Sequence, residues 1–155
     1  MAHTDFIVRA LPPDLLALVR STGVDVSGNP VAPLRAEGGE PLRCCLRNAR
    51  PGEALILFGY EPPIGNSPYR EIGAVFAHAA TCEGPESSAY PAGWRGRKQV
   101  LRSYDRRGWI RDATVHDGSD PEAEIARLFQ DPEAVQIHSR NVAYGCFMFV
   151  VTRSS

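Results

Sequence analysis

The chain has 155 residues, of which 43% are hydrophobic and 23% are charged, a composition typical of a folded domain and not of a disordered chain. Its 17 basic and 18 acidic side chains leave a formal net charge of -1, which disfavours a dedicated nucleic-acid or membrane-surface binder. No apolar run is long enough to predict a membrane-spanning helix. The first residues lack the basic start and cleavage site of a signal peptide, so we expect a cytoplasmic protein with reduced cysteines.

The first half of the sequence predicts one short helix and several strands. A strand is expected at 6–8, and a helix at 14–20 that stops near Gly23. Residues 28–41 are rich in glycine, proline and charge, which predicts a loop. Three more strands are expected in the apolar segments, at 43–46, 54–60 and 72–79.

The second half predicts two hairpins and one well-capped helix. A long loop at 80–97 is followed by a hairpin with strands at 98–104 and 110–115. A helix is expected from Asp120-Pro121 to about residue 130, because aspartate is a preferred N-cap and proline suits the first helical position. A C-terminal hairpin with strands at 135–141 and 145–152 completes the chain.

The strands at 54–60, 72–79 and 145–152 are apolar on both faces, and two helices are too few to cover them. The sheet must therefore curl over itself. We predict an α+β fold with a strongly curved, mainly antiparallel sheet, forming a partial barrel or sandwich with two short helices. No repeat, low-complexity tract or dividing linker is present, so residues 1–155 are expected to form a single domain.

Two histidines lie where chemistry is expected. His78 ends the strand at 72–79, where a sheet meets a loop and pockets often form, and Cys82 follows in that loop. His138 and Arg140 share one face of the strand at 135–141, where they could clamp an anion or transfer a proton. The alternatives are a backbone-bonded histidine at a sheet edge and a solvated outer face.

The hairpin at 95–111 carries seven basic side chains and one acidic side chain, with tryptophan and tyrosine interleaved. This pattern resembles a nucleic-acid groove. The segment 117–133, however, holds six acids and one base. Mutual neutralisation of hairpin and helix is the simpler explanation, and we expect no nucleic-acid partner and no membrane partner.

Four cysteines raise the question of a metal. Together with the histidines, Cys44, Cys45, Cys82 and Cys146 supply enough soft ligands for zinc, and one of them paired with His78 or His138 could be a nucleophile. The spacing contains no Cys-x-x-Cys pair, and strand alternation at 43–46 would place Cys44 and Cys45 on opposite faces. We therefore assign no metal ligand and no cofactor, and zinc at the cysteine and histidine positions stays open as an alternative.

Four segments of the chain form a jointly specific set: Cys44-Cys45-Leu46-Arg47 with Pro51-Gly52-Glu53, Ser67-Pro68-Tyr69-Arg70-Glu71-Ile72-Gly73 through Phe76, His78 and Cys82, Leu101-Arg102-Ser103-Tyr104-Asp105, and His138-Ser139-Arg140 with Tyr144-Gly145-Cys146. Through these segments most of the chain resembles a small bacterial family, domain of unknown function 1203. Ala74 departs from the proline expected after Gly73. The resemblance implies a compact bacterial cytoplasmic domain and marks its shared polar positions, but it implies no reaction.

The leading hypothesis is a pocket for a small anionic or carbonyl-bearing molecule, in a binding domain or an enzyme. Arginines would hold the anion, tyrosines would donate hydrogen bonds, and a histidine would move protons; a joint site would bring His78, Cys82 and His138 together. The catalytic candidates are His78, His138 and Tyr104, and the ligand-binding candidates are Tyr69, Arg70, Arg102, Arg140 and Cys82. The competing hypothesis is a non-catalytic interaction module that uses the basic 95–111 hairpin.

Overall fold

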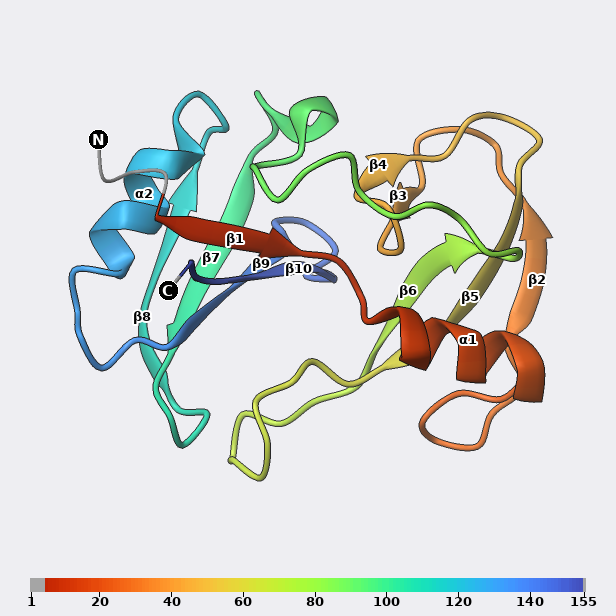
Figure 1. Cartoon of the computed structure of the whole chain (residues 1–155), viewed down its shortest axis with the longest axis horizontal. Coiled ribbons are helices and arrows are strands. Elements are labelled where there is room, and N and C mark those ends of the chain that lie inside the picture. The colour runs from red at the N-terminus through yellow and green to blue at the C-terminus, as the bar shows by residue number, and fades with distance from the viewer. Residues whose placement is uncertain (1–4, 155) are drawn as a thin grey trace. The chain divides into compact units, whose positions relative to one another are not determined.

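The computed structural model describes residues 5–154, which fold as two compact units built from non-adjacent segments (Figure 1). Unit 1 contains the chain up to residue 9, residues 62–71 and the chain from residue 87. Unit 2 contains residues 10–61 and 72–86. No helix in the described part of the chain has the length and apolar character that a membrane crossing requires.

Unit 1 is built on a five-stranded antiparallel sheet in the order β1-β10-β9-β7-β8. Its strands are β1 (Phe6–Arg9), β7 (Gln99–Tyr104), β8 (Ile110–His116), β9 (Gln136–Asn141) and β10 (Phe147–Arg153). Helix α2 (Pro121–Leu128) packs beside β8, and a 3-10 turn, η2, spans Ala92–Trp94. The Asp120 side chain caps α2 by accepting the backbone N–H of Ala123 at 3.2 Å, as the sequence predicts.

The core of unit 1 centres on β10. Five consecutive residues of this strand, from Phe147 to Val151, are buried, which confirms that β10 is covered on both faces. On one side Trp94 stacks on Phe149, with ring centroids 6.1 Å apart. Burial of such aromatic pairs is a large part of what stabilises a unit of this size.

Unit 2 is built on a second five-stranded sheet in the order β2-β5-β6-β3-β4. Its strands are β2 (Ala32–Arg35), β3 (Pro41–Leu42), β4 (Arg47–Asn48), β5 (Ala54–Tyr60) and β6 (Gly73–His78). In this sheet β3 pairs parallel to β6, whereas β2, β5 and β6 form an antiparallel run. Helix α1 (Pro13–Thr22) begins at a proline and ends at Gly23, whose φ of 72° is the left-handed conformation of a helix C-cap.

The α+β class, the two short helices and the mainly antiparallel pairing are confirmed. The strands divide between two sheets, and within the described residues neither sheet closes into a barrel. The segment 28–41, expected to be a loop, contains β2. The prediction that the strand at 72–79 is covered on both faces is also wrong, because Ala74 of β6 is exposed while Val75 and Ala77 are buried.

The prediction of a strand at 43–46 is wrong, because these residues form a tight turn between β3 and β4. The backbone N–H of Leu46 donates to the carbonyl of Leu42 at 2.9 Å, which closes the turn. Leu46 adopts a φ of 58°, a left-handed conformation that is uncommon for leucine. Strand alternation therefore does not apply to the two cysteines at the centre of this turn.

Candidate metal centre

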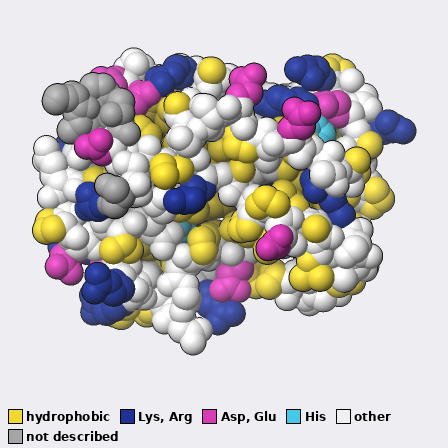
Figure 2. All heavy atoms as spheres, in the orientation of Figure 1, with side chains coloured by type: hydrophobic (Ala, Val, Ile, Leu, Met, Phe, Trp, Pro, Cys, Tyr) yellow, Lys and Arg dark blue, Asp and Glu magenta, His cyan; other side chains and the backbone are white. Residues whose placement is uncertain are grey.

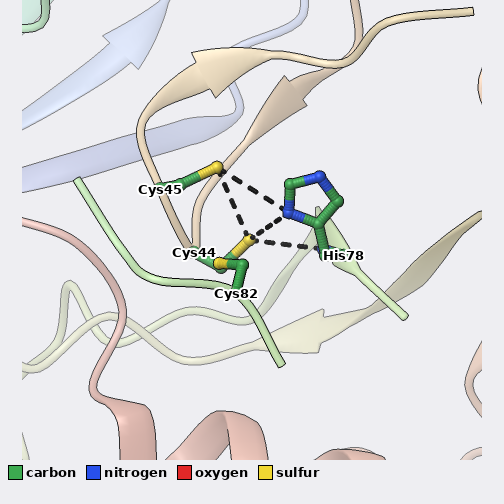
Figure 3. Close-up of side chains that lie close together, drawn as sticks. All are labelled: Cys44, Cys45, His78 and Cys82. Carbon is green, nitrogen blue, oxygen red and sulfur yellow. Dashed lines mark hydrogen bonds between the residues drawn. The ribbon is translucent and has the colours of Figure 1, made fainter. Parts of the chain in front are cut away.

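Three cysteines and one histidine of unit 2 converge on one point (Figure 3). Cys44 and Cys45 come from the 43–46 turn, His78 ends β6, and Cys82 lies in the loop that follows β6. Each residue offers one ligand atom, and the four atoms lie within 4.8 Å of one another. We call these four residues the Cys/His cluster.

The spacing inside the cluster fits tetrahedral coordination. Zinc binds thiolate sulfur at about 2.3 Å and imidazole nitrogen at about 2.0–2.1 Å, so a tetrahedron has sulfur–sulfur edges of about 3.8 Å and sulfur–nitrogen edges of about 3.6 Å. The Sγ atoms of Cys44 and Cys45 are 3.9 Å apart, and they lie 3.4 and 3.8 Å from Nδ1 of His78. A cation at the centre requires only small shifts of these side chains.

Backbone pairing places the turn beside His78. Leu42 of β3 pairs with Phe76 of β6, and the N–H of Arg43 donates to the carbonyl of Phe76 at 2.9 Å. The backbone N–H of His78 then donates to Cys44 Sγ at 3.3 Å. Two segments more than thirty residues apart are thereby held with their sulfur and nitrogen atoms facing the same space.

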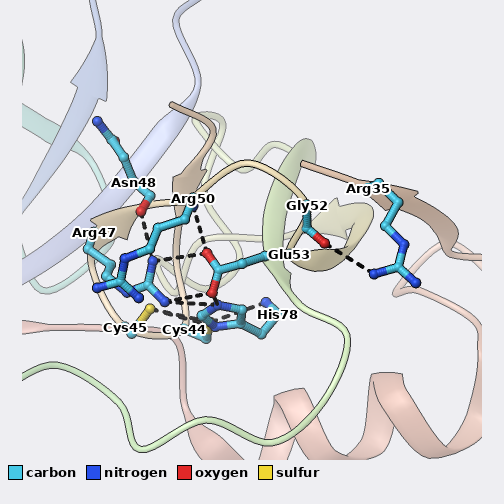
Figure 4. A network of polar contacts seen from close by, with 9 residues as sticks. All are labelled: Arg35, Cys44, Cys45, Arg47, Asn48, Arg50, Gly52, Glu53 and His78. Carbon is cyan, nitrogen blue, oxygen red and sulfur yellow. Dashed lines mark hydrogen bonds and ion pairs between the residues drawn. The ribbon is translucent and has the colours of Figure 1, made fainter. Parts of the chain in front are cut away.

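The other ring nitrogen of His78 is bound by a carboxylate (Figure 4). Nε2 lies 3.0 Å from Oε2 of Glu53, and Glu53 is itself fixed by Arg47 at 2.9 and 3.1 Å and by the backbone N–H of Arg50 at 2.7 Å. Nη2 of Arg47 also lies 3.2 Å from Nε2. In the tautomer that carries its proton on Nε2, the ring donates to the carboxylate, and the lone pair of Nδ1 faces the sulfurs. Carboxylate–histidine pairs of this kind orient metal-binding imidazoles in many proteins.

Without a cation, ionising all three thiols of the cluster is unfavourable. The hydrogen bond with Cys45 and burial raise the pKa of the Cys44 thiol, and burial raises the pKa of Cys82. The Cys44 thiol in turn lowers the pKa of Cys45. These directions favour a negative charge on Cys45 over one on Cys44 or Cys82, and a divalent cation would offset the charge of all three thiolates.

Positive charge also surrounds the cluster. Arg47 donates both Nη atoms to Glu53, and its pKa is raised chiefly by that pair and further by the nearby thiols. Arg20 of α1 donates Nε to the carbonyl of His78 at 3.1 Å and favours a thiolate at Cys82. Zinc with three thiolates and a neutral imidazole carries one net negative charge, and the Glu53 carboxylate adds a second, so the two guanidinium groups offset both.

The cluster is open on one side. A cavity of about 300 Å³ lies against it, lined by Glu53, Ala54, His78, Ala80, Thr81 and Cys82. Cys44 is only 3% exposed, whereas Cys45 and Cys82 are half-buried, and Cys82 forms part of the cavity wall. Of the cluster's sulfurs, Cys82 is thus the one that lines this opening.

The other predicted site residues belong to unit 1, where three of them meet. Arg102 of β7 lies opposite His138 of β9, and its Nη1 donates to the hydroxyl of Tyr104 at 3.4 Å. The rings of Tyr104 and His138 are 4.5 Å apart, and His138 Nε2 lies 2.7 Å from Oε1 of Gln136. Burial, with Arg140 and Arg102, lowers the pKa of His138 to about 3, so this histidine is neutral.

The remaining candidates have separate partners. Arg140 pairs with Glu71 and donates to the carbonyl of Gly145 at 2.9 Å. Tyr69 is partly exposed and makes an edge-on contact with Trp109, with ring centroids 6.0 Å apart. Arg70 donates to the side-chain oxygen of Asn66 at 2.9 Å.

Of the predicted joint site, His78 and Cys82 belong to unit 2 and His138 belongs to unit 1, so a site that unites them stays a prediction. The sequence analysis leaves Cys44 and Cys45 with His78 only as an open zinc alternative, and it misses Glu53 and Arg47 beside them. A signal was present, because the segments 44–47 and 51–53 are among those that resemble the family.

Two arginines of the basic hairpin are paired with the acidic segment within unit 1. Arg95 pairs with Glu122 at the start of α2, and Arg111 bonds Asp131 at 2.8 Å. On the face seen in Figure 2, basic and acidic side chains are interspersed over the surface. These two ion pairs are consistent with mutual neutralisation of the two segments.

The fold and the cluster together define a small α+β protein with a thiol–imidazole centre. A family model described as "Protein of unknown function (DUF1203)" matches residues 39–153, and the chain belongs to this family, as its resemblance predicts. No curated protein and no solved structure matches the chain.

Proposed function

We propose that this protein binds one zinc ion through Cys44, Cys45, His78 and Cys82. The observation that carries the proposal is the convergence of four soft ligand atoms within 4.8 Å, at spacings close to the edges of a zinc tetrahedron. Thiolate and imidazole ligands in this geometry favour zinc over harder cations. Four protein ligands leave no position for water, which is typical of a structural site and not of a catalytic one.

The ion would join three segments, two of which, the 43–46 turn and the end of β6, are already held together by backbone pairing. It would fix the 43–46 turn, the end of β6 and the loop after β6 to one another. Binding free energy at such a site is folding free energy, because the unfolded chain does not preform the ligands. We infer that zinc sets the order of this edge of unit 2.

The test is the metal content of protein purified without chelators. Elemental analysis is expected to give one zinc per chain in the wild type and in Cys146→Ser, whose sulfur lies outside the cluster. Cys44→Ser is expected to lose it. Reconstitution with Co²⁺ should give the thiolate charge-transfer and intense visible bands of a tetrahedral site. A wild type that takes up neither metal would overturn the proposal.

A second candidate function has its own support in unit 1. We propose there a site for a small anionic or carbonyl-bearing molecule, at which Arg102 and Arg140 bind the anion and Tyr104 and His138 contact it. Among the described residues, Nδ1 of His138 and Nε of Arg140 are buried without a hydrogen-bond partner, and buried polar atoms are rarely left so. Tyr69 and Arg70, which also belong to unit 1, remain candidates for its outer contacts.

Ligand-induced stabilisation tests this second function. Small carboxylates and phosphates would be screened for a rise in melting temperature with the wild type, with Arg102→Gln and with Arg106→Gln as the exposed hairpin control. A rise that Arg102→Gln alone abolishes supports the site. If no compound stabilises the wild type, or if both variants respond equally, the function is wrong.

A further inference from the structure

Resting on the proposed zinc site, we infer that Cys82 is an oxidation site: hydrogen peroxide reacts at its sulfur, a disulfide forms with a cysteine of the 43–46 turn, and the metal is released. Three geometrical observations carry this inference: access, the nearness of a second sulfur, and the unequal freedom of the three cysteines.

Access to the cavity favours Cys82. Cys45 and Cys82 are both half-buried, but of the three cysteines only Cys82 lines the cavity of about 300 Å³ beside the cluster, which admits a molecule as small as peroxide. Cys44 is 3% exposed and also accepts the backbone N–H of His78, so an oxidant does not reach its sulfur directly. Susceptibility to oxidation follows thiolate character and exposure, and coordination to zinc keeps a sulfur in its thiolate form.

A second sulfur lies within reach. The Sγ atoms of Cys44 and Cys45 are both within 4.8 Å of Cys82 Sγ, and a disulfide requires about 2.05 Å. The loop that carries Cys82 has no helix or strand between residues 79 and 86, so it is the segment that can move. The turn cysteines are fixed by the β3–β4 hairpin and by the pairing with β6.

A disulfide between the adjacent residues Cys44 and Cys45 is disfavoured. Cys44 and Cys45 are neighbours in the chain, and a bond between them would close a small ring around one peptide unit. Distorting that peptide from planarity is costly. The product we expect therefore joins Cys82 to Cys44 or to Cys45.

The steps balance with peroxide as the oxidant. The Cys82 thiolate attacks one peroxide oxygen, the O–O bond breaks, and hydroxide leaves and takes up a proton to become water. The sulfur, oxidised by two electrons, is now a sulfenic acid. A turn thiolate attacks this sulfur, the S–S bond forms, the S–O bond breaks, and the second hydroxide is protonated to water. With two of its thiolates consumed, the site no longer holds zinc.

The experiment treats zinc-loaded full-length protein with hydrogen peroxide and follows two products. A chromophoric chelator reports released zinc, and peptide mass spectrometry maps the disulfide. We expect one zinc released for each disulfide that contains Cys82, with recovery of the site on reduction in the presence of zinc. Zinc loss accompanied by a Cys44–Cys45 bond, or by sulfinic acid at Cys82 without a disulfide, would overturn the inference, as would full resistance to peroxide.

The variant Cys82→His separates the inference from the function on which it depends. It retains four zinc ligands but lacks the reactive sulfur, so it is expected to bind zinc and to resist release by peroxide, whereas Cys146→Ser should behave as the wild type. If Cys82→His does not fold, the disulfide map of the wild type still tests whether peroxide joins Cys82 to a turn cysteine. If the wild type carries no zinc, the proposed function fails, and the same map in the metal-free protein tests the reactivity of Cys82 by itself.

Discussion

The substitution Glu53→Gln tests the carboxylate that orients His78. Glu53 lies 3.0 Å from His78 Nε2 and accepts hydrogen bonds from Arg47 and from the Arg50 backbone, and Arg47 holds the pKa of Glu53 well below the usual range. The amide has nearly the same size but no charge, and only its carbonyl oxygen can accept from Nε2, where Arg47 competes for it. The imidazole is then held less firmly in the tautomer and orientation that turn the lone pair of Nδ1 toward the sulfurs.

The expected loss is in zinc affinity and not in folding. Substitution of a carboxylate that supports a metal-binding histidine costs roughly 10–100-fold in metal affinity, or about 1.4–2.8 kcal/mol. The Arg47–Glu53 pair is partly exposed, with side-chain exposures of 32% and 24%, so its loss should cost the metal-free protein no more than about 1 kcal/mol.

The assay is competition for zinc against a chromophoric chelator, paired with urea unfolding of the metal-free protein. Glu40→Gln is the matched control, because Glu40 also accepts backbone N–H groups in unit 2 but has no contact with the cluster. An unchanged zinc Kd in Glu53→Gln, or an equal weakening in both variants, would refute the role given to Glu53.

Three further predictions concern the metal, acid stability and a glycine. Free zinc at about 100 times its Kd should stabilise the wild type by about 2.7 kcal/mol, an effect that excess EDTA reverses and Cys44→Ser lacks in thermal melts. The pKa of His138 is about 3 in the fold and 6.5 ordinarily, so the unfolded chain binds the proton first and stability falls as pH falls between these values. Between about pH 7 and pH 5, the free energy of unfolding measured in urea titrations should therefore fall by about 2 kcal/mol less in His138→Gln than in the wild type. Parallel plots of unfolding free energy against pH for the two proteins would contradict this assignment. Gly118 has a φ of +87°, and a Cβ there would lie 2.3 Å from the backbone nitrogen of Arg97, so Gly118→Ala should destabilise by about 2 kcal/mol or more. Gly93→Ala, at a position with open space and no positive φ, is the control and should change stability by less than about 1 kcal/mol.

The elements that could be predicted are those whose signals are local. The run of apolar residues in β10 and the Asp120-Pro121 start of α2 are each contained in a few neighbouring residues, and both are confirmed. The division into two sheets depends instead on pairings between distant segments, such as β1 with β10. No periodicity in the sequence encodes which strands meet.

Two of the four cluster residues could be predicted, for a similar reason. His78 ends an apolar strand and Cys82 follows it, which marks both as site candidates. Cys44 and Cys45 are assigned to opposite faces only because strand alternation is applied to residues that form a turn. That turn depends on the left-handed conformation of Leu46, a residue type that does not signal it as glycine or asparagine would. Pairing of β3 with β6, which brings the turn to His78, is again long-range.

The central claim is that the sulfurs of Cys44, Cys45 and Cys82 and Nδ1 of His78 hold one zinc ion. X-ray absorption at the zinc edge, measured on full-length protein loaded with one equivalent, counts these ligands directly. The account predicts three sulfur atoms at about 2.3 Å and one nitrogen at about 2.0–2.1 Å. A shell made only of nitrogen and oxygen atoms would contradict it.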